Sequence, residues 1–118
     1  MKYRRMSLEY QNNLEIYGSW NQLKEFFIDN STETDILSLD ESVLLEWDKD
    51  ILEEKSEVLY YVFLSKNIKA EWLDMMAKKY KNLEFNLIYQ NEEKEIYGEI
   101  VYKNGILYHR DDEIVEEL

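Results

Sequence analysis

Cysteine and proline are absent from the chain of 118 residues, and glycine occurs only three times. The lack of cysteine excludes a disulfide scaffold, thiol catalysis and a cysteine-ligated zinc site. The lack of proline removes the commonest rigid turn former, so the turns must depend on glycine, asparagine, aspartate and serine. With so few glycines there is also no glycine-rich loop of the kind that binds phosphate groups.

Long apolar runs are missing as well. No stretch of about 18 apolar residues occurs, so no transmembrane helix is expected. The start, MKYRRMSLEY, is basic but lacks the apolar centre of a signal peptide, which favours a cytoplasmic location. Apolar residues still make up 45% of the chain, which is enough for one folded domain over residues 1–118. We expect its ends, 1–11 and 112–118, to fray.

Positive charge is the third shortage. The 14 lysines and arginines are outnumbered by 26 aspartates and glutamates, which gives a net charge of −12. Such a chain is repelled by nucleic-acid phosphates and by anionic membranes. It favours a basic protein surface as a partner instead. The alternative interpretation is that the acidic residues only keep the protein soluble.

The spacing of apolar residues predicts the elements of the first half. Alternation over residues 12–18 is typical of a strand, and Ser19 fits the N-cap of a helix that ends near Asn30. Residues 36–40 are a weak strand candidate, and residues 41–57 fit either a short helix or an ordered loop. The apolar face of the helix consists of Trp20, Leu23, Phe26 and Phe27.

The second half has stronger patterns. Residues 58–66 are almost continuously apolar, which suits a central strand covered on both faces or nearly so. Apolar residues at helical spacing predict a helix over 69–80. Strict alternation then predicts strands over 83–90 and 95–102. The Asn104–Gly105 pair matches a type I′ turn, so a returning strand should follow it.

This order of elements indicates an α+β fold with an antiparallel sheet. Its β-α-β-β-α-β core is the ferredoxin-like arrangement, with both helices on one face of the sheet and an extra C-terminal hairpin that extends it. We expect one shared core that includes Phe26, Phe63, Leu73, Ala77, Phe85 and Leu87.

Several short motifs of the second half recur in one known family. They are VFLSK, then Trp72, Ala77 and Tyr80 on the helix, LEFNLIY, IYGEIVY, and the turn glycine Gly105, while LEIYGS stands near the start. In order and spacing the chain resembles the YubB-like ferredoxin-like domain family of phage and plasmid genomes. The family usually has prolines before the helix tryptophan, and SKNIKAEW has none. The resemblance implies a fold and a mobile-element setting but no active site.

Residues suited to catalysis or metal binding occur without the partners that such chemistry needs. His109 is the only histidine, and no second ligand accompanies it at a metal-binding spacing. The acids that follow it, Asp111 to Glu113, do not have the spacing of a calcium-binding loop. We therefore expect no catalytic residues, no metal and no cofactor.

The most distinctive feature is a segregation of charge. Glu33 to Glu57 contains ten acids and two lysines, interleaved with apolar residues, whereas lysines gather around the helix of residues 69–80. Acids around apolar anchors suit a surface that docks on a basic groove. The residues expected to bind the partner are Glu46, Trp47, Asp48, Asp50, Glu53 and Glu54.

Three functional hypotheses follow. The first is a small non-catalytic inhibitor, encoded by a phage or other mobile element, that blocks a host nucleic-acid-handling defence complex, as anti-CRISPR proteins do. The second is an immunity protein that neutralises a basic toxin. The third is an enzyme or a nucleotide binder that uses the face of the sheet. The genes that neighbour this one would separate the first two hypotheses.

Overall fold

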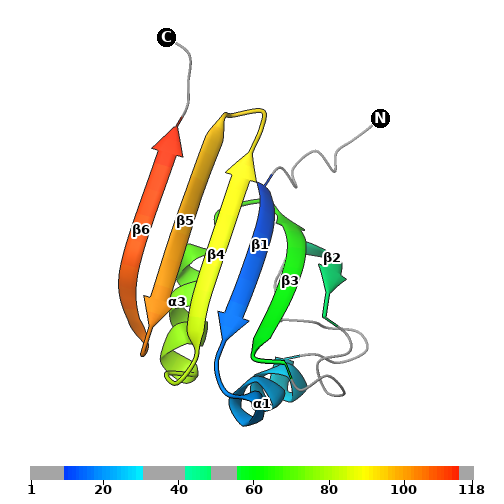
Figure 1. Cartoon of the computed structure of the whole chain (residues 1–118). Helices are drawn as coiled ribbons and strands as arrows, with labels where there is room; N and C mark the ends of the chain where they lie inside the picture. Colours follow the sequence, from blue (N-terminus) through cyan, green and yellow to red (C-terminus); the bar gives the residue numbers. More distant parts are fainter. Residues whose placement is uncertain (1–9, 31–41, 49–55, 115–118) are drawn as a thin grey trace.

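The strands lie in a sheet order that differs from their order in the sequence. A computed structural model describes residues 10–30, 42–48 and 56–114. Its elements are β1 (Tyr10–Tyr17), α1 (Trp20–Asn30), β2 (Ser42–Trp47), β3 (Val58–Ser65), α3 (Ala70–Lys79), β4 (Glu84–Asn91), β5 (Ile96–Lys103) and β6 (Ile106–Ile114). The six strands form one antiparallel sheet in the order β2-β3-β1-β4-β5-β6 (Figure 1). The predicted α+β class with an antiparallel sheet is confirmed.

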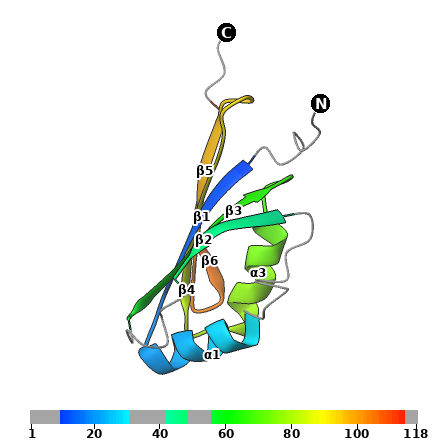
Figure 2. The ribbon, with the colours of Figure 1, turned by 90° about the vertical axis from the view of Figure 1, so that its right-hand side faces the viewer.

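Both helices pack against the same face of this sheet. They lie behind the strands in Figure 1, and the edge-on view in Figure 2 shows α3 alongside the sheet and α1 across one end of it. The side chains that alternate inward from the strands meet the helices in a single apolar core. That core contains Phe26, Phe63, Leu73, Ala77, Phe85 and Leu87, as expected from the sequence, together with Leu14, Ile16, Leu59, Tyr61, Tyr89 and Ile100.

Two local signals in the sequence have the predicted geometry. The Ser19 hydroxyl accepts a hydrogen bond from the Gln22 amide at 3.4 Å, and Gln22 Oε1 accepts one from the Ser19 amide at 3.4 Å, which is a reciprocal capping box at the start of α1. Asn104 and Gly105 both have positive φ, 56° and 75°, as a type I′ turn requires. This turn joins β5 directly to β6.

The region before β3 differs from the prediction. Residues 42–47, expected in a short helix or an ordered loop, form the edge strand β2. The helical interpretation was wrong because Leu44 and Leu45, which are adjacent in the sequence, do not break the strand. A bulge between Leu44 and Glu46 inserts Leu45 without a partner on β3. The weak strand candidate at 36–40 lies outside the described residues.

Two other strands differ from expectation in detail. β3 is an inner strand, but among the described residues only one of its faces is covered, and the side chains on its other face are half-buried. β6 continues past the expected short return as far as Ile114, which pairs with Ile96. Both strands of the C-terminal hairpin are therefore at least as long as the central strands of the sheet.

Candidate functional site: the acidic open face of the sheet

The helices leave one face of the sheet uncovered, and we call this the open face. No described helix or loop lies in front of it in Figure 1. Because side chains alternate between the two faces of a strand, every second residue belongs to it. On β1 these residues are Gln11, Asn13, Glu15 and Tyr17, all exposed, whereas the residues between them are buried. The register then assigns the open-face residues of the other strands.

Carboxylates from five of the six strands lie on the open face. They are Glu46 of β2, Glu15 of β1, Glu84 of β4, Glu99 of β5 and Asp111 of β6. Among the described residues, the basic side chains on this face are Lys103 and His109. The open face is therefore predominantly negative at neutral pH.

Five of the described lysines gather on the other side of the molecule. They belong to α3 or to the loops on either side of it, and they are Lys66, Lys69, Lys78, Lys79 and Lys81. α3 lies behind the sheet in Figure 1. Acids on the two helices, Glu25, Asp29, Glu71 and Asp74, offset much of this positive charge. The charge segregation is therefore mainly an excess of carboxylates on the open face, which attracts a basic partner to that face.

Tyrosine hydroxyls hold two of the open-face carboxylates. Tyr17 donates a hydrogen bond to Glu15 Oε1 at 2.6 Å, and Tyr60 donates one to Glu46 Oε2 at 3.2 Å. The hydrogen bond to Glu15, together with burial and the nearby charges of Glu15 and Glu84, raises the pKa of Tyr17. Tyr17 therefore remains a neutral donor at physiological pH. Both hydrogen bonds hold carboxylates that would otherwise sample many rotamers.

The structure separates the residues that the sequence placed in one docking patch. Glu46 is exposed on the open face, next to Tyr60. Trp47 points to the opposite side of β2, where it is half-buried and packs against the core. Asp48 is half-buried, and its backbone amide donates to the carbonyl oxygen of Tyr60 at 3.2 Å. The other three residues of that patch, at 50, 53 and 54, lie outside the described residues.

Sequence reasoning did not identify Glu15, Glu84 and Glu99 as members of one surface. The alternation that predicts each strand also predicts that these residues point away from the core. However, they are far apart in the sequence, and only the pairing of β1 with β4 and of β4 with β5 brings them together. Strand order was the missing information.

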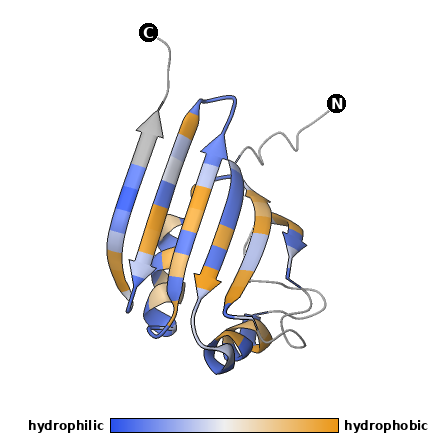
Figure 3. Ribbon diagram, in the orientation of Figure 1, coloured by the Kyte–Doolittle hydropathy of each residue, from blue (hydrophilic) through white to orange (hydrophobic). Residues whose placement is uncertain are grey.

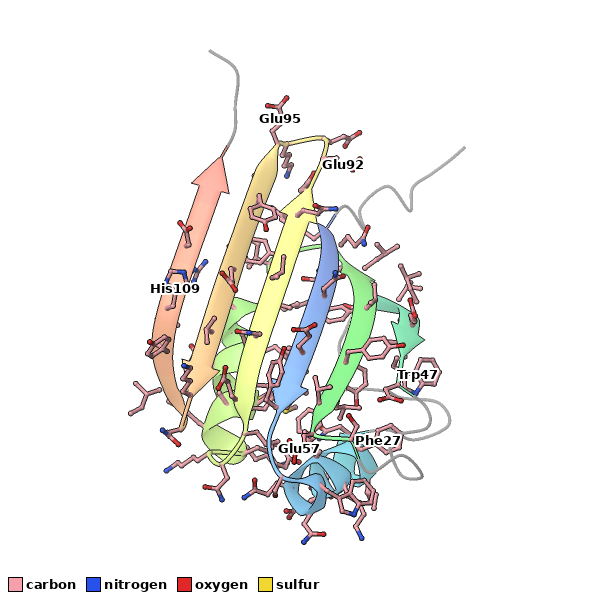
Figure 4. The ribbon with its side chains drawn as sticks, in the orientation of Figure 1. Phe27, Trp47, Glu57, Glu92, Glu95 and His109 are labelled. Carbon is pink, nitrogen blue, oxygen red and sulfur yellow. The ribbon has the colours of Figure 1, made fainter. Side chains whose placement is uncertain are left out.

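His109 lies at the β6 edge of the open face (Figure 4). Its Nε2 is 4.0 Å from Glu99 Oε1, and Glu99 is directly opposite Asp111. Like charges directly opposite each other on adjacent strands are destabilising. A protonated His109, or a cation from a partner, would reduce the repulsion between these two carboxylates.

A polar hollow between α1 and the loop before β4 is the clearest alternative site. Here the Tyr80 hydroxyl donates to Asp29 Oδ2 at 2.9 Å and accepts from Asn30 Nδ2 at 3.2 Å. Burial is the main cause that raises the pKa of Tyr80, and Asp29 raises it further. The hollow is also lined by Gln22, Glu25, Lys79, Lys81, Asn82 and Leu83. Its hydrogen bonds tie α1 to the end of α3, and it contains no nucleophile beside a general base.

Two further observations concern the described residues as a whole. No group of three or more histidines, aspartates and glutamates among them is arranged to hold a metal ion. Neither α1 nor α3 has the length and apolar character needed to span a bilayer.

Comparisons with known proteins give no relative. No family model matches the chain, and no curated protein or solved structure matches it. The resemblance to the YubB-like ferredoxin-like domain family therefore stays a prediction that depends on the motifs quoted above.

Proposed function

We propose that this protein is a non-catalytic binding protein that docks its acidic open face on a basic surface of another protein. The observation that carries the proposal is the set of carboxylates that β1, β2, β4, β5 and β6 contribute to one uncovered face, while most of the described lysines lie in or beside α3. Complementary charge of this kind steers encounter and orients the two partners. The net charge of −12 adds to the same attraction.

The partner that fits this face best is a nucleic-acid-binding effector with a cationic channel. Glu99 and Asp111 are directly opposite each other, and the other carboxylates are offset along the strands, so the negative charge is spread across the face. Such a distribution of charge occupies the same lysines and arginines that would contact phosphates. An inhibitor of a host defence complex, of the anti-CRISPR type and encoded by a phage or mobile element, would work in this way.

We also propose that the first four strands and the two helices form a ferredoxin-like arrangement. The order β2-β3-β1-β4, with β1 and β3 inside, supports this assignment. The β5–β6 hairpin then extends the sheet beyond β4. This assignment supports the resemblance to the YubB-like family and with it the mobile-element setting.

The proposal is tested by reversing charge on the open face. A triple variant, Glu15→Lys, Glu84→Lys and Glu99→Lys, should bind a basic nucleic-acid-binding effector with a much slower association rate. The affinity of the unchanged protein should fall as salt rises from low to physiological concentration, because exposed charges are screened over about 8–10 Å. Surface plasmon resonance at several salt concentrations measures both.

A matched control changes the net charge equally on other surfaces. Glu25→Lys, Glu71→Lys and Glu93→Lys replace three exposed acids of α1, α3 and the β4–β5 turn. If this control slows association as much as the open-face triple variant does, the effect comes from net charge alone and the proposed docking face is wrong. An affinity that does not depend on salt would exclude acidic docking altogether.

A further inference from the structure

β3 carries an apolar stripe on the open face. Its four outward side chains are Val58, Tyr60, Val62 and Leu64, which we call the β3 stripe, and all are half-buried. Val43 of β2, which is 44% exposed, lies directly opposite Leu64 and widens the stripe. Figure 3 shows apolar residues along most of β3, in contrast to the more polar β1 beside it.

The stripe departs from the usual pattern of an antiparallel sheet with one wet face. Such strands alternate apolar residues toward the core with polar residues toward water. β1 follows this rule, with Gln11, Asn13 and Glu15 on the open face. β3 does not, because its outward residues are as apolar as its buried ones. A continuous apolar strip of this kind is typical of a surface that another element covers.

One carboxylate lies on each side of the stripe. On the β1 side, Glu15 is directly opposite Tyr60. On the β2 side, Glu46 is opposite Val62 and accepts the hydrogen bond of Tyr60. The surface therefore has an apolar centre, a mostly polar edge along β1 and one carboxylate on each side. An apolar centre with a polar edge is the usual arrangement of a protein–protein interface.

Resting on the proposed function, we propose that the β3 stripe binds a basic amphipathic helix of the partner protein. The stripe extends over about 20 Å, because successive outward residues of a strand are about 6.6 Å apart. A helix of about 13 residues has the same length. Its apolar side chains would cover the valines and Leu64, and lysines or arginines on its flanks would reach Glu15 on one side and Glu46 on the other.

The probe for this proposal is a pair of fluorescent peptides of about 14 residues composed of leucine and lysine. In one peptide the leucines follow the helical period, and in the other leucine and lysine strictly alternate, as in a strand. The helical peptide should bind and gain helical circular dichroism when it does. Tighter binding of the alternating peptide would overturn the choice of a helix as the occupant.

The matched variants separate the stripe from the charge around it. Val58→Thr with Val62→Thr keeps β-branched residues on β3, so the strand should form as before while apolar contact is lost. Binding of the helical peptide should weaken about tenfold. Ile88→Thr makes the same chemical change on β4, on the open face but away from the stripe, and should leave binding unchanged. Thermal unfolding of all variants confirms that they are folded.

The outcomes distinguish this inference from the proposed function. Salt-dependent binding that the double threonine variant leaves intact would overturn the stripe as the docking site while acidic docking stands. Binding that needs the stripe but does not depend on salt would overturn the basic partner. Sedimentation equilibrium adds one more test. If the unchanged protein is a dimer and the double threonine variant is a monomer, the stripe binds a second copy of this chain. That result would overturn the proposal of a partner helix.

Discussion

The ring of Tyr89 on β4 covers Gly98, its direct partner on β5. A β-carbon placed on Gly98 would overlap the hydroxyl oxygen and Cζ of Tyr89, which is fully buried. The absence of a side chain at position 98 is therefore what allows the tyrosine ring to lie flat across the sheet and to meet Tyr10 edge to face, with ring centroids 6.3 Å apart.

Gly98→Ala should therefore destabilise the protein by about 1–3 kcal/mol, the usual range for overpacking in a core. Urea unfolding with an unchanged denaturant slope measures this. In a Tyr89→Leu background the same alanine should have much less effect, because the atoms that it would meet are gone. Equal effects of the alanine in both backgrounds would mean that the strand conformation at Gly98, and not the ring, sets the need for glycine.

The Tyr102–Asp74 contact predicts a loss of stability in alkali. Burial, and then the hydrogen bond that its hydroxyl donates to Asp74 at 2.7 Å, raise the pKa of Tyr102 to about 12. A tyrosine whose pKa is higher in the folded state stabilises the fold below about pH 10, and that contribution is lost as the pH rises toward 12. Unfolding free energies measured from pH 9 to 12 should fall.

Tyr102→Phe should make that fall smaller, although Tyr17 and Tyr80, whose pKa values are also raised, keep part of it. At neutral pH the same variant should lose about 1 kcal/mol, the usual value of one hydrogen bond. Tyr108→Phe is the control because the Tyr108 side chain is 67% exposed. Its ring contacts the Lys103 ammonium group, 4.0 Å from the ring centroid, and phenylalanine keeps this ring. A pH profile that is identical for Tyr102→Phe and the unchanged protein would contradict the assignment.

Trp47→Ala tests whether this tryptophan is a core residue or a binding anchor. Since Trp47 is half-buried and packs against the core, we expect a loss of about 1–3 kcal/mol in unfolding free energy. The dissociation rate from a basic partner should change little at a temperature where the variant is still folded. Faster dissociation with unchanged stability would return Trp47 to the docking surface.

Glu95 offers a way to raise stability. It ends the turn between β4 and β5 with a φ of 54°, a conformation that costs a residue with a β-carbon about 1–2 kcal/mol. Glu95→Gly should therefore stabilise the protein by about 0.5–1 kcal/mol in thermal or urea unfolding. Glu93→Gly in the same turn should destabilise it or have no effect. If Glu95→Gly lowers the stability as Glu93→Gly does, the entropy that glycine adds to the unfolded chain outweighs the relief of strain at position 95.

The elements that the sequence predicted well are those in which local chemistry and tertiary packing agree. Ser19 and Gln22 form a helix start with their own side chains, and Asn104 and Gly105 form a turn with their own backbone preferences. Neither needs a distant residue. For the same reason the alternating strands β1, β4 and β5 were assigned within a few residues of their observed ends.

The elements that were missed depend on distant partners. The adjacent Leu44 and Leu45 look helical in isolation, and only pairing with Phe63 and Val62 shows that one of them occupies a bulge. The acidic open face was missed for the same reason, because strand pairing between distant segments creates it. The sequence revealed a run of acids near Glu46 but not that Glu15 lies one strand away from the apolar residues of β3. Charge density along a chain and charge density on a surface are different quantities.

The position of β1 within the sheet has a consequence for how the protein folds. Both neighbours of β1 lie far along the chain, because Tyr17 pairs with Val58 on one side and with Glu84 on the other. Contacts of such large sequence separation slow folding, whereas the β4-β5-β6 meander is local. On the ribosome β1 is made before either neighbour, so it emerges with both hydrogen-bonding edges unpaired and stays exposed to chaperones until β3 and β4 have been translated.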